Sequence, residues 1–509
     1  MKILNRFAIA FVCSFMCLSM LINAENIVVG GNTAGPSTLD PAEAWDNTST
    51  IYLSNIFNRL VELDRDSLKI KPSLASGWDS NSDGTVWVFR LRRGVKFHDG
   101  TPFDADAVVF TFKRQMEETY KYGEFVLFRE IFSFLKSVEK IGKYKVRFIL
   151  KKSFFLFPAS LSAACASIIS PSALKEKKEK FRYEPVGTGP YKMKEWKKGK
   201  KIVLESFDGY WKGKPGIDKY VAIIEPNMDK LFELFRKQKV DLLMSFSISR
   251  MVILKSYKWV GYDYSSSLST NYIAFNMKNK YLKKLGIRKA INFLWNKDIL
   301  KLVYQNHVEP MCSLFPKGMS GYDCNFDKYP MSIEKAAAIL KKEGLNKGFE
   351  LKFLVKRDSN LELPTAKKFA QNLKKVGIRI KIVNVGMDEY FLKISKGEYD
   401  LTFSSWIADY PDPYSIIQPL FSKEIQQKGV ANFSSGNNRD IVEMIEKART
   451  MRNSSERENL YTKLNKIVVE RALFVPLYQD ISLIIYNKRI GKVKQDKLGD
   501  IDLFRLGKQ

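Results

Sequence analysis

Apolar residues recur along the chain with two periods, one typical of strands and one typical of helices. β-branched or aromatic residues at alternate positions predict strands at residues 25–29, 86–91, 144–150, 201–205, 220–224, 272–275, 349–355 and 378–383. Apolar residues three or four positions apart predict helices at residues 49–60, 105–115, 228–237, 287–295, 333–342, 365–376, 388–395, 440–449 and 454–470. Because strands and helices alternate, we expect an α/β fold with mixed sheets covered by helices.

A polar stretch interrupts this pattern at residues 264–270, which read YSSSLST and come just before a predicted strand. We place a hinge there. The segment at residues 472–480 (ALFVPLYQD) is again typical of an extended chain. A length of 509 residues exceeds what one core usually supports, so we expect two or more lobes. A chain that leaves one lobe and returns late crosses between them twice.

The first residues have the pattern of a secretory signal peptide. Lys2 and Arg6 precede an apolar run at residues 7–22, and Ala24 supplies the small residue that a signal peptidase requires. The run is shorter than the roughly 20 residues of a membrane-spanning helix. We therefore predict cleavage after Ala24 and export to the periplasm. The residues before the two cysteines of this run are too large for a lipoprotein signal, so no lipid anchor is expected.

One later stretch, residues 153–170, carries no charge over 18 residues, but Pro158 and five serines predict a buried element rather than a membrane span. It contains Cys165, which we expect to be a buried thiol. Cys312 and Cys324 are the natural disulfide pair in an oxidising compartment. Closing so short a loop stabilises the fold by about 3 kcal/mol, mainly through the unfolded state.

The formal charge of +29 comes mostly from lysines scattered along the whole chain. A solvated, lysine-rich surface explains this charge. Two other interpretations stay open, namely a preference for acidic ligands and weak adhesion to anionic membrane surfaces. An exported protein rarely meets nucleic acid, and no basic stripe interleaved with aromatic residues is visible, so we expect no nucleic-acid partner.

The sequence offers little from which to build a catalytic or metal site. Its only histidines are His98 and His307, too few for a histidine metal cluster or a catalytic triad, and we expect both to be structural. Residues 187–190 (GTGP) lack the lysine and helix start of a nucleotide site, which predicts a rigid turn. We therefore expect no enzymatic activity, no metal and no cofactor.

Residues 74–114 (LASGWDSNSDGTVWVFRLRRGVKFHDGTPFDADAVVFTFKR) predict a strand hairpin followed by a helix that Asp104 caps. This block resembles a signature of family 5 of the extracellular solute-binding proteins, the dipeptide- and oligopeptide-binding receptors of bacterial ATP-binding-cassette (ABC) importers. Further blocks resemble the family in its order and spacing, and together they cover nearly the whole chain after the signal peptide. They lie at residues 38–63, 185–196, 210–215, 271–297 and 406–413.

The resemblance implies a two-lobed periplasmic-binding-protein fold, of the class with an extra subdomain in the large lobe and two hinge crossings. The expected divisions are a signal peptide at 1–24, a large lobe at 25–265 with an inserted subdomain at about 66–180, a second lobe at 266–472 and a return to the large lobe at 473–509.

The implied function is that of a monomeric receptor that takes short peptides to an ABC-type permease in the inner membrane. Some relatives bind nickel chelates, haem, glutathione or sugars instead, so other solutes remain open. A chaperone or adhesion role driven by the positive charge is a second alternative. A hydrolase is a third, and it lacks a paired nucleophile and base.

The resemblance also implies how the ligand is anchored. The family binds its peptide as an extra strand between the lobes, and an acid in the WxxDYxDP-like block pairs with the ligand's ammonium group. In this sequence that acid is Asp409. In the alternative interpretation, Asp409 only caps the turn at residues 410–413.

Residues on either side of Asp409 complete this part of the predicted site. Ser405 and Ile407 offer backbone groups that could hydrogen-bond the ligand, and Tyr410 follows the acid. Trp406 is either an aromatic wall of the site or a core residue.

Two further segments are implied to contact the ligand. Pro36, Ser37 and Thr38 are expected to face it from the other lobe, although Pro36 has no backbone N–H to donate. Dipeptide receptors bind the ligand's carboxylate with an arginine after a strand of the second lobe. Here that residue is Arg357, with Lys356 behind it.

Overall fold

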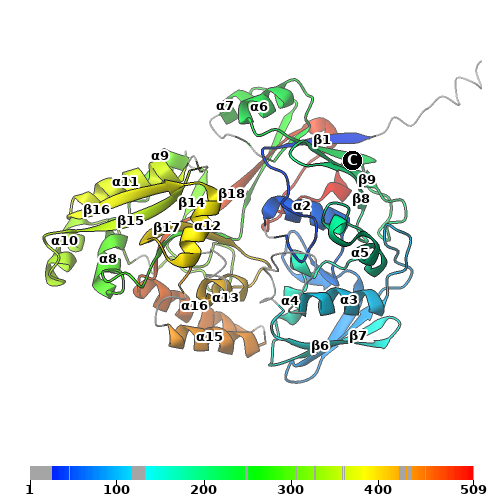
Figure 1. The fold of residues 1–509 in the computed structure, drawn as a ribbon, viewed down its shortest axis with the longest axis horizontal. Helices are drawn as coiled ribbons and strands as arrows, with labels where there is room; N and C mark the ends of the chain where they lie inside the picture. The colour runs from blue at the N-terminus through cyan, green and yellow to red at the C-terminus, as the bar shows by residue number, and fades with distance from the viewer. Residues whose placement is uncertain are drawn as a thin grey trace, which may run out of the picture.

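The computed structural model describes residues 26–507 except 45, 117–131, 245, 247–249, 305–306, 326–327, 358, 360, 424–430, 434–437 and 453. The predicted signal peptide lies outside these residues. Figure 1 shows strands and helices in two lobes, as the sequence pattern predicted. Among the described helices, none combines the length and the apolar character that a membrane crossing needs. The uncharged stretch at 153–170 forms the short helix α4 (Phe157–Ser160) and a single 3-10 turn, both largely buried.

One mixed sheet runs through both lobes. Its main path has the order β16-β15-β17-β13-β18-β11-β1-β10-β9-β8, and β12 and β14 pair with β18 beside this path. These strands are β1 (Ile27–Asn32), β8 (Tyr191–Lys197), β9 (Lys201–Ser206), β10 (Lys219–Ile224), β11 (Leu242–Leu243), β12 (Val260–Ser266), β13 (Ser269–Phe275), β14 (Val308–Pro310), β15 (Phe349–Lys356), β16 (Ile378–Val385), β17 (Leu401–Ile407) and β18 (Phe474–Asn487).

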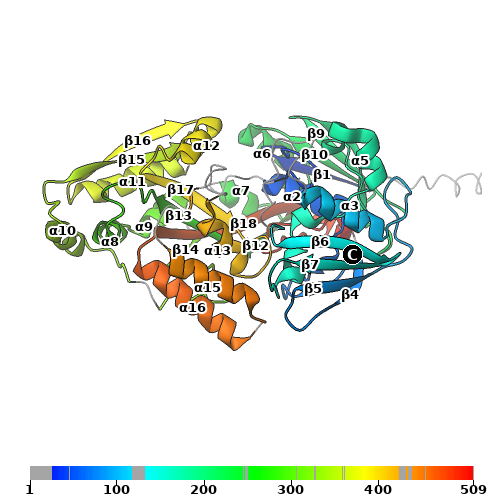
Figure 2. The same ribbon diagram turned by 60° about the horizontal axis from the view of Figure 1, so that its bottom comes forward.

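The long strand β18 joins the two lobes (Figure 2). Its first residues pair with β13 of the second lobe, and its last residues pair with β12 and β11 of the large lobe. The chain also crosses between β12, which ends at Ser266, and β13, which begins at Ser269. There the N–H of Leu268 donates to the carbonyl of Lys497 at 2.8 Å. The polar stretch predicted as a hinge therefore spans a strand junction between the lobes.

A smaller sheet forms the subdomain inserted in the large lobe. It is antiparallel, with the order β4-β5-β7-β6, and α3 (Ala105–Met116) packs against it. The strands are β4 (Ala75–Ser80), β5 (Val86–Leu91), β6 (Leu135–Gly142) and β7 (Lys145–Leu150). Buried aromatic rings fill the core beneath it; Phe148, for example, meets Phe112 edge to face, with centroids 5.0 Å apart. A two-stranded sheet of β2 (Val61–Leu63) and β3 (Ile70–Pro72) lies between the two parts of the lobe in sequence.

Helices cover the sheets, and several of them begin at a polar side-chain cap. Asp46 caps α2, and Ser454 caps α16 by accepting a hydrogen bond from the N–H of Arg457. The remaining longer helices are α5 (Pro171–Lys177), α6 (Met228–Arg236), α7 (Met251–Lys255), α8 (Leu285–Phe293), α9 (Asp298–Tyr304), α10 (Ile333–Lys342), α11 (Glu362–Lys374), α12 (Met387–Lys396), α13 (Tyr414–Phe421) and α15 (Arg439–Thr450), with α2 at Asn47–Ile56 and α16 at Ser455–Glu470.

His98 holds the glycine-rich turn at 187–190 against α2. Its Nδ1 accepts from the N–H of Gly187 at 3.3 Å, so Nε2 carries the proton and donates to the carbonyl of Gly189 at 3.0 Å. A Cβ on Gly187 would lie 2.2 Å from the carbonyl oxygen of Ile56, which explains the glycine. Burial lowers the pKa of His98 to about 4, so the ring stays neutral.

The three cysteines of the described chain have separate roles. The structure joins Cys312 and Cys324 by a disulfide, with Cα atoms 5.4 Å apart. Cys165 is a free, buried thiol, and burial raises its pKa.

Candidate functional site

A cavity of about 420 Å³ lies between the two lobes. We call it the central cavity. In Figure 1, α12 and β17 of the second lobe face α2 of the large lobe. The cavity is lined from the large lobe by Ala44, Asp46, Asn47, Thr50, Arg59, Ser162, Ala163, Ala164, Cys165, Leu498 and Asp500, and from the second lobe by Lys356, Met387, Tyr390, Phe391, Ala431 and residues 403–409. Its size suits a small molecule or a short peptide.

Strand β17 presents an open edge to this cavity. On one side, all seven of its residues pair with β13. On the other side, β15 pairs only with Leu401 and Thr402, so residues 404–407 have no strand partner there within the described chain. Three of the predicted residues, Ser405, Trp406 and Ile407, lie on this edge and line the cavity. An extended ligand could add to the sheet at this place.

Asp409 follows this edge and lies where the central cavity meets a second cavity of about 280 Å³. It makes no ion pair with any described residue. Burial raises the pKa of Asp409 to about 7. The indole N–H of Trp406 offsets part of this rise in the pKa of Asp409. Nε1 of Trp406 is buried, and it makes no hydrogen bond of regular geometry with any described residue. Asp409 is thus a carboxyl group without a cationic partner among the residues that the structure describes.

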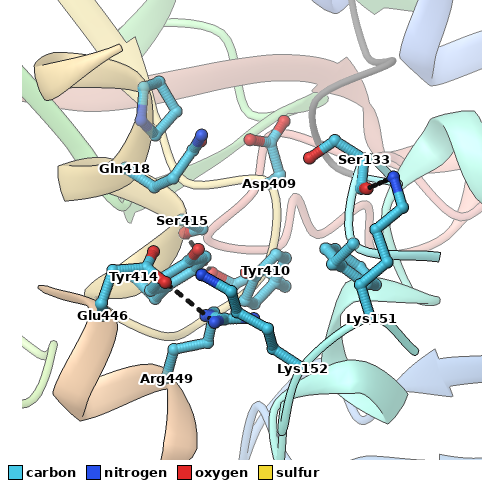
Figure 3. Close-up of a pocket in the computed structure, with 12 residues that line it drawn as sticks. Ser133, Lys151, Lys152, Asp409, Tyr410, Tyr414, Ser415, Gln418, Glu446 and Arg449 are labelled. Carbon is cyan, nitrogen blue, oxygen red and sulfur yellow. Dashed lines mark hydrogen bonds and ion pairs between the residues drawn. The ribbon is translucent and has the colours of Figure 1, made fainter. Parts of the chain in front are cut away.

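The second cavity separates Asp409 from a group of charged residues (Figure 3). There the carboxylate of Asp409 points away from Lys152 and Arg449. Arg449 instead pairs with Glu446 at 2.8 Å, and Lys151 donates to the carbonyl of Ser133 at 2.8 Å. Tyr410, another predicted residue, is buried and lines this second cavity rather than the central one.

Asp412, three residues after Asp409, occupies a different environment. Its Oδ1 accepts from the N–H of Tyr414 at 2.9 Å and from the hydroxyl of Tyr461 at 2.8 Å. Its Oδ2 pairs with the buried Arg457 at 2.6 Å. The turn therefore has its capping carboxylate in Asp412, which leaves Asp409 available to a ligand.

The structure does not place Pro36, Ser37 or Thr38 on the central cavity. Pro36 and Thr38 are buried, and the hydroxyl of Thr38 accepts from the N–H of Asp40 at 3.1 Å. The Ser37 hydroxyl donates to Asp46 at 2.5 Å, and Asp46 is the residue that reaches the cavity. The hydroxyls of Ser37 and Thr38 are thus bonded within their own turn, and the contact of this segment's backbone with a ligand stays a prediction.

Arg357 also lies away from the cavity. Strand β15 ends at Lys356, and Arg357 lies in the turn that follows it. Arg357 is exposed and donates to the carbonyl of Asn384 at 3.4 Å. Lys356 is the residue that lines the central cavity, where its Nζ pairs with Glu362 at 2.8 Å and lies over the ring of Tyr390.

Three charged residues of the cavity, namely Asp46, Arg59 and Asp500, were not predicted from the sequence. Arg59 follows α2, and Asp500 lies near the end of the described chain; both line the central cavity and a third cavity behind it. Burial raises the pKa of Asp500 to about 7. The side chains that line the central cavity include three acids and two bases, although the whole chain is strongly basic. The positive net charge of the whole chain therefore does not predict the charge of the cavity.

A cavity between two lobes that crossing strands join is typical of binding proteins that close around a small ligand. A family model described as bacterial extracellular solute-binding proteins, family 5, matches residues 69–428. The dipeptide-binding protein of Escherichia coli is 30% identical over 82% of both chains. Heme-binding protein A of Haemophilus influenzae is 29% identical over 94% of this chain and 91% of the relative.

Solved structures agree with these relatives. The ABC transporter-associated periplasmic binding protein DppA from Helicobacter pylori, in complex with the peptide STSA, superposes with a TM-score of 0.83 at 29% identity, over 94% of this chain and 97% of that one. The chain therefore belongs to family 5 of the bacterial extracellular solute-binding proteins. The fold and the family predicted from the sequence are confirmed.

Proposed function

We propose that this protein is a monomeric, non-enzymatic periplasmic receptor that captures short peptides between its lobes and delivers them to an ABC-type permease of the inner membrane. In this role the ammonium group of the peptide pairs with Asp409, and the peptide backbone adds to β17. The observation that carries the proposal is the carboxylate of Asp409, which borders the central cavity without an ion-pair partner in the described chain.

The chemistry of Asp409 favours a ligand with a free amine. A carboxylate in a buried position is costly unless a cation compensates it. Burial has raised its pKa to about 7, so a ligand ammonium would restore the charged form and gain a charge-assisted hydrogen bond. A heme or a metal chelate offers no such group by necessity, whereas every unmodified peptide does.

The open edge of β17 supports a peptide in particular. Residues 404–407 can bond to a peptide backbone whatever its side chains are, which suits a receptor for varied sequences. The relatives differ in the ligand that they bind, since one is a dipeptide-binding protein and another a heme-binding protein. Of these two ligands, the open edge of β17 favours a peptide.

Closure of the lobes follows from where the contacts lie. We place the lobe boundaries near residues 265 and 473, because the strands cross at Ser266–Ser269 and in β18. A ligand that contacts both lobes stabilises the closed form, whereas one that contacts a single lobe leaves the equilibrium unchanged. The closed form is then the one that the permease recognises.

The test uses the purified chain from residue 25 onward, with endogenous ligand removed by partial unfolding and refolding. The peptides Ser-Thr-Ser-Ala and Met-Leu should raise its melting temperature, and the same peptides acetylated at the amino end should not. At a ligand concentration of about 100 times the Kd, binding adds about 2.7 kcal/mol of stability. Equal shifts with both forms would contradict the role of Asp409, and no shift with any peptide would contradict peptide binding.

A further inference from the structure

We propose that Arg59 of the large lobe binds the carboxylate end of the peptide. This inference rests on the proposed function, and it deepens it by assigning the second end of the ligand. The ligand class it defines is a short peptide with both a free ammonium group and a free carboxylate.

Arg59 has hydrogen-bonding capacity to spare. A guanidinium group has five N–H donors arranged as a planar fork that matches a carboxylate. In the described chain, Nη1 of Arg59 donates to the carbonyl of Ser162 at 2.7 Å, while Nη2 lies 3.9 Å from Oδ2 of Asp500. That second contact is an ion pair, but it is too long for a direct hydrogen bond. The side chain is only 15% exposed, so a bound carboxylate would be largely shielded from water.

The positions of Arg59 and Asp409 suit the two ends of one ligand. Both line the central cavity, Arg59 from the large lobe and Asp409 from the second lobe. Each also lines a further cavity that the other does not, Asp409 the second and Arg59 the third. Cys165 lies within electrostatic reach of both: after burial, Asp409 raises its thiol pKa and Arg59 lowers it.

Lys356 is the other cation on the central cavity, and it is a weaker candidate. Its Nζ already pairs with Glu362 at 2.8 Å, and that carboxylate is buried, with 9% of its side chain exposed. A ligand carboxylate would have to displace this close, hydrogen-bonded ion pair, whereas the ion pair of Arg59 with Asp500 is longer, at 3.9 Å. Lys356 also belongs to the same lobe as Asp409. A peptide held by Asp409 and Lys356 alone would not draw the lobes together through its charged ends.

If Arg59 binds the carboxylate, the ligand itself favours closure of the two lobes. The ammonium end would be fixed on the second lobe and the carboxylate end on the large lobe, so each end contributes only when the lobes approach. It also sets a length limit, since an extended chain spans about 3.3–3.6 Å per residue. Peptides too long to fit between Asp409 and Arg59 would lose one of the two contacts.

The experiment compares peptide acids with peptide amides by isothermal titration calorimetry on the full mature chain. The probes are Met-Leu and Ser-Thr-Ser-Ala, each with a free carboxylate or a carboxamide. The variants are Arg59→Gln, Arg59→Lys and Lys356→Met. Arg65→Gln is the matched control, because Arg65 lines the third cavity and pairs with Asp496 at 3.2 Å but does not line the central cavity.

We expect the wild-type protein to bind at least one peptide acid about 100-fold more tightly than its amide. Arg59→Gln should lose about the same factor for that acid and almost none for the amide. Arg59→Lys, which keeps the charge without the fork, should fall between. Arg65→Gln and Lys356→Met should preserve the preference for the acid.

Three results would overturn the inference. One is equal binding of acid and amide by the wild-type protein, a test that needs no variant. Another is an acid preference that survives Arg59→Gln, and a third is a preference that disappears only in Lys356→Met. If the wild-type protein binds neither form of any peptide, the proposed function itself is wrong and this assignment fails with it.

Discussion

Asp409 and Asp412 lie three residues apart in one turn, and their surroundings differ in almost every respect. Asp412 is fully enclosed and receives bonds from Arg457, Tyr461 and the backbone of Tyr414. Asp409 borders two cavities and has no cation in the described chain. One carboxylate is satisfied by the fold, and the other is left for something that the fold does not supply.

The difference shows how a single turn can separate stability from binding. The ion pair of Asp412 ties the end of β17 to α16, which keeps the turn in place. Asp409 is held on that fixed turn half-buried and without a cationic partner among the described residues, and its raised pKa reflects the missing cation. Strained or unsatisfied groups of this kind are typical of functional sites.

The largest expected effect is the loss of folding stability when Asp412 is replaced. Asp412→Ala should lower the free energy of unfolding by about 3–5 kcal/mol, because Arg457 would remain buried without its partner. Urea unfolding measures this. Asp440→Ala is the control, since its ion pair with Arg471 is exposed and worth at most about 1 kcal/mol. Equal losses in the two variants would mean that Asp412 has no special structural role.

The next effect is on binding at the Asp409 side. Asp409→Asn should weaken the binding of unmodified peptides by about 100-fold, while the free energy of unfolding of the empty protein stays equal or rises. Calorimetry and urea unfolding measure the two quantities. The control is Asp46→Asn, which removes another charge from the same cavity but keeps a good helix cap. A similar loss of affinity in the control would mean that the summed negative charge of the cavity, and not Asp409 in particular, binds the peptide.

A smaller effect is expected from pH. Burial raises the pKa of Asp409 to about 7, so its carboxyl group takes up a proton as the pH falls through that value. Affinity for an unmodified peptide should then fall by about tenfold per pH unit below 7. The stability of the empty protein changes the other way, because a raised folded-state pKa contributes stability at low pH that is lost as the pH rises through 7.

Calorimetry between pH 5.5 and 7.5 measures this slope. Asp500 has a pKa raised to a similar value in the same cavity, so it needs its own control. The slope should remain in Asp500→Asn and disappear in Asp409→Asn. The reverse result would show that Asp500 of the large lobe, and not Asp409 of the second lobe, is the group whose titration controls binding.

The smallest effect concerns Trp406, whose indole N–H lowers the pKa of Asp409. Trp406→Phe keeps an aromatic wall and removes that N–H. The pH midpoint of peptide binding should move upward by less than about one unit, and affinity at pH 8 should change by less than about 1 kcal/mol. A downward movement of the midpoint would show that the indole does not favour the charged carboxylate.

Local patterns in the sequence were enough to predict most of the fold. The strand at residues 86–91 and the helix at 333–342 agree with β5 and α10 residue for residue, because their alternating or helical spacing decides which face is buried. The helix α13 was not predicted, since Pro413 and Pro419 obscure a short apolar run. Asp409 could be proposed only through the family resemblance of its block.

Other parts of the site depend on tertiary structure. Arg59 and Asp500 are more than 400 positions apart, and no local signal shows that they meet at one cavity. Arg357 was chosen because the family resemblance implies an arginine after this strand, and only the packed structure shows that Lys356, the last residue of β15, is the one that lines the cavity. Such details require the packed chain.

The central claim is that Asp409 pairs with the ammonium group of a peptide. Its most direct test is the coupling between Asp409→Asn and acetylation of the peptide's amino end, measured by calorimetry with Ser-Thr-Ser-Ala. Acetylation should weaken binding to the wild-type protein by about 100-fold and binding to Asp409→Asn by less than about threefold, a coupling of more than about 2 kcal/mol. The same loss on acetylation in both proteins would contradict the claim.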